Sequence, residues 1–147
     1  MDYFCDTKWT LKKYVIFLDI DGTLVGEGET KIDSKTKRAF DELKKNNFIV
    51  LCSNSPNKKR SEKMAKELKV LWNSGPHKKP NKEVLTYIKL PTNKKHAVIG
   101  NLHCIDGRFA KAIDAEFFPV KTLVNPKENW IDKIFYWIDS HLLSKCI

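Results

Sequence analysis

Residues 14–25 read YVIFLDIDGTLV, an apolar run that ends in two acidic residues. The β-branched and aromatic residues from Val15 to Leu18 predict a central strand of a parallel sheet, covered on both faces. Charged side chains are excluded from such a core unless they are paired or bind a metal, so we expect Asp19 and Asp21 at the carboxyl edge of the sheet. Gly22 then allows a sharp turn. The structural alternative is that both carboxylates only cap a turn.

Further apolar segments alternate with helical patterns along the chain. Strands are predicted at 48–54, 70–72, 96–100 and 119–124, and helices at 34–47, 58–69, 81–90, 107–115 and 130–143. Ser34 is the expected N-cap of the first helix, and Pro56 favours a helix start after the second strand. This alternation predicts an α/β, three-layer Rossmann-like fold with a mostly parallel sheet and helices on both faces.

The size and composition predict one intracellular domain. The 147 residues are most simply a single unit, 1–147, with a core at about 14–125 and a C-terminal helix at about 129–143. The four cysteines form no Cys-x-x-Cys pair, which favours reduced thiols. The N-terminus lacks the pattern of a signal peptide and no segment reaches membrane-spanning length, so we expect a cytoplasmic protein.

The chain is strongly basic, with a formal net charge of +9. Such a surface favours anionic partners, namely nucleic acid, an anionic membrane or phosphorylated substrates. The helix predicted at 58–69 carries a basic cluster that fits a polyanion site. The cluster comprises Lys58, Lys59, Arg60, Lys63, Lys66 and Lys69. The alternative is a lysine-rich face that is simply solvated.

The Asp-x-Asp-Gly-Thr sequence at 19–23 resembles the nucleophile motif of the haloacid dehalogenase-like (HAD) superfamily, most of whose members are Mg²⁺-dependent phosphohydrolases. The resemblance implies that Asp19 attacks phosphorus and that Asp21 is the general acid and base. Thr23 would order this loop beside the bound phosphate. The resemblance extends over about residues 14–124, but only this motif is specific to the family.

Two further motifs would hold the phosphoryl group. Ser53, with Asn54 beside it, follows the second strand where the family places a phosphate-binding hydroxyl, and backbone N–H groups at a helix start suit an anion. A simple strand-to-helix turn is the alternative. Lys79 before Pro80 resembles the family's charge-neutralising lysine, with Lys78 as its rival.

The expected metal loop departs from the family pattern. After the strand at 96–100 the family usually has Gly-Asp, whereas this chain has Gly100-Asn101 and then Asp106. Mg²⁺ accepts an amide oxygen, so the expected metal set is Asp19, Asp21, Asn101 and Asp106, with one negative charge fewer. Asp106 has three open uses: a ligand to the metal, a partner for Lys79, or a helix N-cap.

Other phosphatase and metal chemistries fit poorly. Cys104 and Arg108 are too close for the loop of cysteine-dependent phosphatases, and no Walker-type stretch occurs. The four histidines show no zinc-binding spacing. His103 falls in the expected metal loop, where it could contact substrate.

The gaps between the motifs leave no room for a cap domain. This spacing is most similar to the capless subgroup that includes phosphatidylglycerophosphate phosphatases, and polynucleotide 3′-phosphatase domains share the same core. The resemblance therefore implies a Mg²⁺-dependent phosphomonoester hydrolase with an open cleft and a bulky phosphorylated substrate. The alternative is a catalytically weakened binding module for nucleic acid or another anionic partner.

The C-terminal helix is amphipathic, with an apolar stripe. The stripe predicts a helix packed on the sheet. The aromatic residues from Phe135 to Trp137 exceed one face, so part of this helix is also a candidate contact for a second subunit or a membrane surface. The stripe comprises Trp130, Ile134, Trp137, Ile138 and Leu142.

Overall fold

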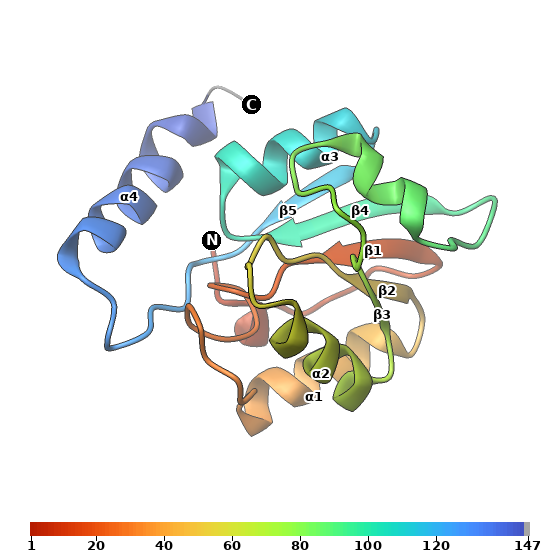
Figure 1. The fold of residues 1–147 in the computed structure, drawn as a ribbon, viewed down its shortest axis with the longest axis horizontal. Coiled ribbons are helices and arrows are strands. Elements are labelled where there is room, and N and C mark those ends of the chain that lie inside the picture. The colour runs from red at the N-terminus through yellow and green to blue at the C-terminus, as the bar shows by residue number, and fades with distance from the viewer. Residues whose placement is uncertain (146–147) are drawn as a thin grey trace.

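A five-stranded, all-parallel sheet forms the centre of the protein (Figure 1). The computed structural model describes residues 1–145. The strand order is β3-β2-β1-β4-β5, which confirms the predicted α/β fold. The strands are β1 (Tyr14–Leu18), β2 (Phe48–Leu51), β3 (Leu71–Trp72), β4 (Lys95–Gly100) and β5 (Glu116–Pro119). The chain runs from β1 outward to β3 and then crosses to β4, so the switch point of the sheet lies between β1 and β4.

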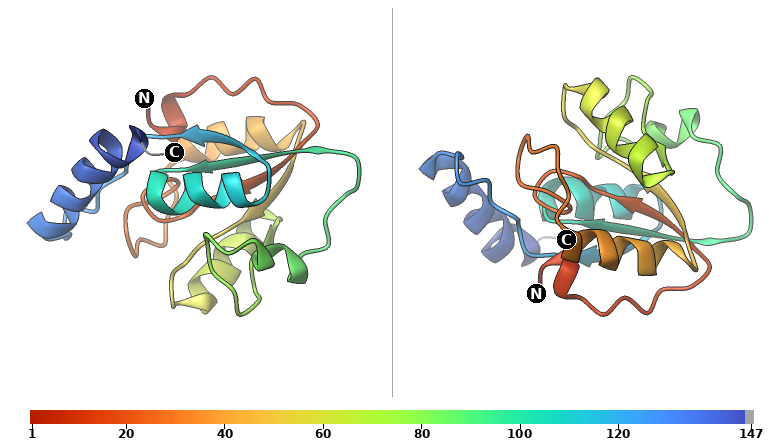
Figure 2. Two further views of the ribbon diagram at one scale, coloured as in Figure 1. Left: turned by 90° about the horizontal axis from the view of Figure 1, so that it is seen from above. Right: turned by 90° about the horizontal axis from the view of Figure 1, so that it is seen from below.

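Helices cover both faces of this sheet, as Figures 1 and 2 show. On one face α1 (Ser34–Lys44), α2 (Lys58–Leu68) and the short η1 (Phe4–Asp6) pack on Ile16 and Leu18. On the other face η2 (Lys82–Tyr87) and α3 (Arg108–Ala112) pack on Val15 and Phe17. Successive side chains of a strand point to opposite faces, so β1 supplies both cores.

Several element boundaries differ from prediction. Asp33, not Ser34, caps α1, because its carboxylate accepts hydrogen bonds from both the backbone N–H and the hydroxyl of Thr36. The helix predicted at 81–90 is the shorter 3₁₀ segment η2. The helix predicted at 107–115 is α3, preceded by one π-helical turn, η3 (His103–Gly107).

The last strand was predicted too late in the sequence. β5 comprises 116–119 rather than 119–124, since Phe117 and Phe118 pair with Val98 and Ile99 of β4. Pro119 lies opposite Gly100, the last residue of β4, so the ladder ends there for want of a neighbouring strand.

The C-terminal helix exists as predicted, but its packing was predicted wrongly. α4 (Trp130–His141) lies outside the helix layers, beyond the carboxyl ends of the strands (Figures 1 and 2). Trp130 and Trp137 are 70% and 57% exposed, and Asp139 is the buried residue of this helix. Within residues 1–145, no helix is long and apolar enough to cross a membrane.

Candidate active site

Asp19 lies at the carboxyl end of the central strand. Its backbone N–H still donates to Ile99 O of β4, at 2.9 Å, so the ladder fixes its position. One carboxylate oxygen, Oδ1, lies 2.8 Å from Lys79 Nζ. The other, Oδ2, accepts a hydrogen bond of 3.3 Å from the Thr23 hydroxyl. Thr23 is fully buried, so its hydroxyl supports Asp19 and presents no surface to a substrate.

Lys79, rather than Lys78, reaches the buried carboxylates. Its ammonium group bridges Asp19 and Asp106, at 2.8 and 2.5 Å, while Lys78 is exposed. Asp106 is almost fully buried, and its second oxygen accepts from Leu102 N–H. Asp106 lies inside η3 and makes no helix cap, so its contacts match the second of the three predicted uses, a partner for Lys79.

Burial and neighbouring charges act in opposite directions on the pKa values of Asp19 and Lys79. Desolvation raises the pKa of Asp19 to about 7, although Lys79 acts in the opposite direction and lowers it. Burial also lowers the pKa of Lys79, but the carboxylates of Asp106 and Asp19 outweigh it and hold that pKa above its usual value. Lys79 is therefore a fixed positive charge next to the candidate nucleophile.

A buried arginine holds the second carboxylate, Asp21. Nη2 of Arg60, on α2, lies 2.5 Å from both oxygens of Asp21. Nη1 of the same guanidinium donates to Glu29 O at 2.6 Å. The Asp21 carboxylate also accepts hydrogen bonds from Gly28 N–H and from the Ser53 hydroxyl. Arg60 thereby ties Asp21 to the loop that follows β1.

Ser53 and Asn54 follow β2 and meet the other motifs. The Ser53 hydroxyl donates to Asp21 Oδ2 at 3.3 Å and accepts from Ser55 N–H at 3.0 Å. The Asn54 amide accepts from Lys79 N–H and donates to Lys79 O, so it fixes the backbone that carries the lysine. Both residues are thus brought to the edge where Asp19 lies, with Asn54 as a brace for Lys79.

Three oxygens converge at the end of β4. Asn101 Oδ1 lies 3.1 Å from the Asp21 carbonyl oxygen and 3.1 Å from Asp19 Oδ2. Neighbouring ligand oxygens around Mg²⁺ are about 2.9 Å apart, given Mg–O distances of about 2.0–2.1 Å, so the spacing fits this ion. In the absence of a cation, hydrogen bonding favours the same amide turned over, with its NH₂ group donating to both oxygens and its oxygen accepting from the Thr122 hydroxyl. The orientation that suits Mg²⁺ therefore requires the ion itself.

The donor set is weak for a metal site. No three His, Cys, Asp or Glu side chains converge on a metal position anywhere in residues 1–145. A Mg²⁺ ion held by this corner would rely on one carboxylate, one backbone carbonyl and one amide. Of the four predicted ligands, Asp19, Asp21 through its carbonyl, and Asn101 are brought together, while Asp106 faces Lys79.

Two glycines permit this close packing. Gly22 has φ +79°, and a Cβ there would lie 2.4 Å from the Asn101 side chain. A Cβ on Gly100 would lie 2.3 Å from the carboxyl carbon of Asp106. Any larger residue at these positions would therefore displace Asn101 or Asp106, the partner of Lys79.

The residues of the motifs line a small cleft of about 220 Å³. Leu102, Ile105 and Pro56 form its apolar wall, opposite Glu27. Burial raises the pKa of Glu27, and the charge of Asp21 raises it further. The remaining lining residues are Asp19, Asp21, Asn54, Ser55, Lys79 and Asp106.

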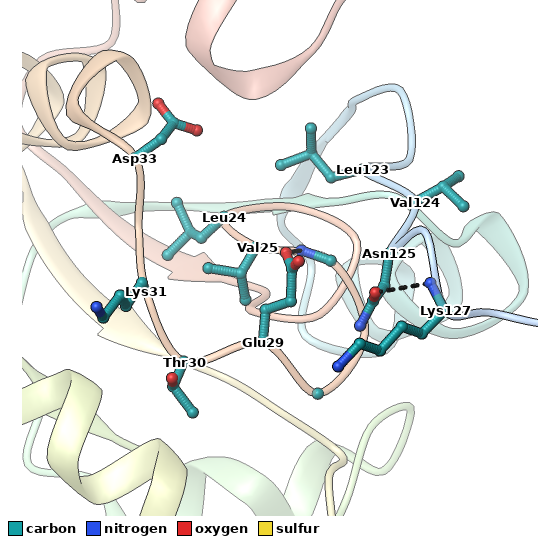
Figure 3. Close-up of a pocket in the computed structure, with 12 residues that line it drawn as sticks. Leu24, Val25, Glu29, Thr30, Lys31, Asp33, Leu123, Val124, Asn125 and Lys127 are labelled. Carbon is teal, nitrogen blue, oxygen red and sulfur yellow. Dashed lines mark hydrogen bonds between the residues drawn. The ribbon is translucent and has the colours of Figure 1, made fainter.

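A larger pocket of about 590 Å³ lies beside the cleft, between the loop after β1 and the segment before α4 (Figure 3). Neither Asp19 nor Lys79 lines it. Its carboxylates already have partners, because Glu29 accepts from Gly26 N–H and Asp33 caps α1. We therefore place the chemistry in the smaller cleft.

The sequence reasoning missed the roles of three supporting residues. It predicts Arg60 as part of the basic cluster at 58–69, but Arg60 is buried and paired with Asp21. It is the only arginine in a lysine-rich helix, and the planar, bidentate preference of arginine was the available signal. Asn73 exchanges hydrogen bonds with the backbone of Ser53, and no local pattern marks it. Asp139 accepts from His103 N–H and Cys104 N–H, so the predicted substrate residue His103 is instead buried against α4.

Comparisons with known proteins place the chain in a family. No curated protein gives a significant match. Among solved structures, a chain of the Pnkp1/Rnl/Hen1 complex has a similar fold, with a TM-score of 0.50 and 13% identity. The similarity covers 81% of this chain but half of that chain. Residues 16–102 match the model of the haloacid dehalogenase-like hydrolases, a span that includes Asp19, Lys79 and Asn101. The chain therefore belongs to the haloacid dehalogenase-like hydrolase family.

Proposed function

We propose that this protein is a Mg²⁺-dependent phosphomonoester hydrolase that works through an aspartyl-phosphate intermediate. The observation that carries the proposal is the arrangement around Asp19, which has Lys79 on one carboxylate oxygen and the Asn101 corner beside the other. A carboxylate with an ammonium group fixed beside it is suited to accept a phosphoryl group, because the developing charge needs such stabilisation.

The two displacements follow from the positions of the side chains. In the first, an Asp19 oxygen bonds to phosphorus, the bond from phosphorus to the ester oxygen breaks, and that oxygen takes a proton from Asp21. This role requires that Asp21 leave its ion pair with Arg60 and bind a proton before the step. In the second, water attacks phosphorus and returns a proton to Asp21, and inorganic phosphate leaves Asp19. Ser53 and Lys79 hold the phosphoryl oxygens, while Asp106 and Asn54 hold Lys79.

The metal position is the least charged part of the site. Asp19, the Asp21 carbonyl and Asn101 would hold Mg²⁺, which when bound neutralises charge on the phosphoryl oxygens. With Asn101 in place of an acid, the binding set carries one negative charge fewer, so a weak affinity for Mg²⁺ follows.

The shape of the site supports a bulky substrate. Within residues 1–145, the chain between β1 and β2 holds only a loop and α1, and the chain between β2 and η2 holds only α2 and β3, so no cap covers the cleft. A volume of about 220 Å³ accommodates a phosphoryl group and little more, so the leaving group extends outside. Phosphorylated lipids, nucleotides, sugars and nucleic-acid ends are the substrate classes to compare.

The test is hydrolysis of an aryl phosphate with and without Mg²⁺, using wild type and Asp19→Asn. We expect Mg²⁺-dependent release of phosphate that the substitution abolishes. The matched control is Asp114→Asn, an exposed site on the loop after α3, which should retain wild-type activity. Turnover that persists in Asp19→Asn would remove the nucleophile from the proposal.

A second candidate function is a binding module for nucleic acid, favoured by Asn101 and by the net charge of +9. The exposed lysines of the basic helix are Lys58, Lys59, Lys63 and Lys66, with Lys69 at its end. Salt-dependent binding of oligonucleotides without Mg²⁺-dependent turnover would favour this function. Absence of binding at low salt would exclude it.

A further inference from the structure

The helix α4 packs on the protein through its polar side. Asp139 is fully buried and its carboxylate accepts hydrogen bonds from His103 N–H, at 2.7 Å, and Cys104 N–H, at 2.9 Å. Tyr136 is partly buried beside Glu128, and burial raises its pKa. Hydrogen bonds to η3 therefore anchor this helix.

The opposite side of α4 is apolar and exposed. At 100° per residue, seven large apolar side chains fall within an arc of about 160°. Two of them are Ile138, which is half-buried, and Leu142. The other five are Trp130, Ile131, Ile134, Phe135 and Trp137, which we call the α4 patch, and they are 43–70% exposed. Figures 1 and 2 show that this helix stands at one end of the molecule. Monomeric proteins seldom leave a contiguous apolar surface of this kind uncovered.

The area of the α4 patch fits a protein interface. Large apolar side chains carry roughly 150–250 Å² each, so the patch presents on the order of 500–600 Å². A standard interface buries about 800 Å² per partner, with an aromatic centre and a polar rim. Two tryptophans and a phenylalanine at the centre, with Lys133 and Asp132 beside them, match that anatomy.

The charged residues of α4 indicate which kind of partner covers the α4 patch. An anionic membrane would need a basic flank, but the ionisable residues of α4 are Asp132, Lys133, Asp139 and His141, which nearly balance. The excess lysines lie on other elements, such as α2, where salt screens their repulsion over a Debye length of about 8 Å. A balanced, apolar helix face is suited to pairing with an identical face around a two-fold axis.

We propose that the α4 patch is the interface of a homodimer, in which two copies of α4 pack face to face with Ile134 and Trp137 near the two-fold axis. The same helix anchors η3, which carries Asp106, the partner of Lys79. Dimerisation would therefore brace the loop that positions the catalytic lysine. The partner is a second copy of this chain, and the inference does not depend on the proposed hydrolysis.

The experiment measures the molar mass of the full chain by light scattering after gel filtration, across roughly a hundredfold range of protein concentration. We expect about 34 kDa at the high end, twice the 17.1 kDa of one chain. Ile134→Glu and, independently, Trp137→Ser should each return the mass to 17.1 kDa with an unchanged circular dichroism spectrum. The matched control is Leu71→Glu, which alters a side chain of similar exposure, 44% against 46%, and should remain dimeric.

A second experiment distinguishes membrane binding from dimerisation. Flotation with vesicles of phosphatidylcholine and phosphatidylserine should leave the protein unbound. A monomeric mass at every concentration, an unchanged dimer in both α4 variants, or vesicle binding that Ile134→Glu abolishes would each overturn the proposal.

Discussion

At the scale of single residues, the site depends on one buried ammonium group. Lys79 is 5% exposed and is held by two carboxylates, Asp19 and Asp106. An ion pair of this kind is costly to break, because removal of one partner leaves the other charge buried and unpaired. If the proposed hydrolysis holds, Asp106 acts through Lys79 as a positioning residue.

Asp106→Asn should therefore lower both stability and activity. We expect a loss of about 3 kcal/mol in the free energy of unfolding, because one buried partner of Lys79 loses its charge. The aryl-phosphate kcat should fall roughly 10- to 100-fold as the lysine moves from its productive position. Urea denaturation and steady-state kinetics measure the two effects. An unchanged kcat would contradict the positioning role.

Asn101→Asp tests the metal corner. The new carboxylate lies 3.1 Å from Asp19 Oδ2 and would repel it until a cation binds between them. We expect Mg²⁺ affinity, measured by calorimetry, to rise roughly tenfold from the added charge. Asn93→Asp adds the same charge at an exposed turn and should leave the affinity unchanged. A weaker affinity in Asn101→Asp would place the ion elsewhere.

The pKa of Asp19 predicts how stability depends on pH in the absence of metal. This pKa is about 7 in the folded protein and 3.8 in the unfolded chain. At a pH between these two values, the folded state therefore retains a proton that the unfolded state has lost. Stability should therefore fall as pH rises from about 4 to 7, by roughly 1 kcal/mol per pH unit, and then level off. Denaturation in a chelator should show this trend in wild type and not in Asp19→Asn.

At the scale of elements, the carboxyl ends of β1, β2 and β4 gather the motifs, and α2 secures them. Arg60 spans from α2 to Asp21 and to the carbonyl of Glu29, so one side chain links the helix, the acid and the loop after β1. The planar guanidinium group makes these hydrogen bonds simultaneously, whereas the single ammonium group of a lysine cannot.

Arg60→Lys should consequently lower activity while it preserves the charge. We expect kcat to fall roughly tenfold, because a single ammonium group cannot hold both Asp21 and the loop in position. Lys63→Ala, an exposed change on the same helix, is the control and should have no effect. Wild-type kinetics in Arg60→Lys would show that charge alone suffices at this position.

At the scale of the whole molecule, net charge should govern which substrates the open cleft attracts. A chain of +9 draws polyanions at long range, and the effect weakens as salt screens it. We expect KM for a phosphorylated oligonucleotide to rise steeply between low and physiological salt, while KM for an aryl phosphate changes little. Equal salt dependence for both substrates would mean that the basic surface plays no part in their capture.

The sequence alone determined the centre of this protein. The apolar run at 15–18 and the acids after it predicted β1 as a central strand with Asp19 at the carboxyl edge, because a strand buried on both faces leaves a clear local pattern. The motif order also predicted that Asp19, Ser53, Lys79 and Asn101 would share one edge, since the carboxyl ends of parallel strands meet there.

Only the tertiary structure decided the supporting contacts. Arg60 and Asp21 are 39 residues apart, and His103 and Asp139 are 36 apart, so no local pattern could pair them. The position of β5 depended on where β4 ends, and the orientation of α4 depended on a buried carboxylate that accepts from η3. Periodicity shows that a helix has an apolar face, but neighbouring donors decide which face packs inward.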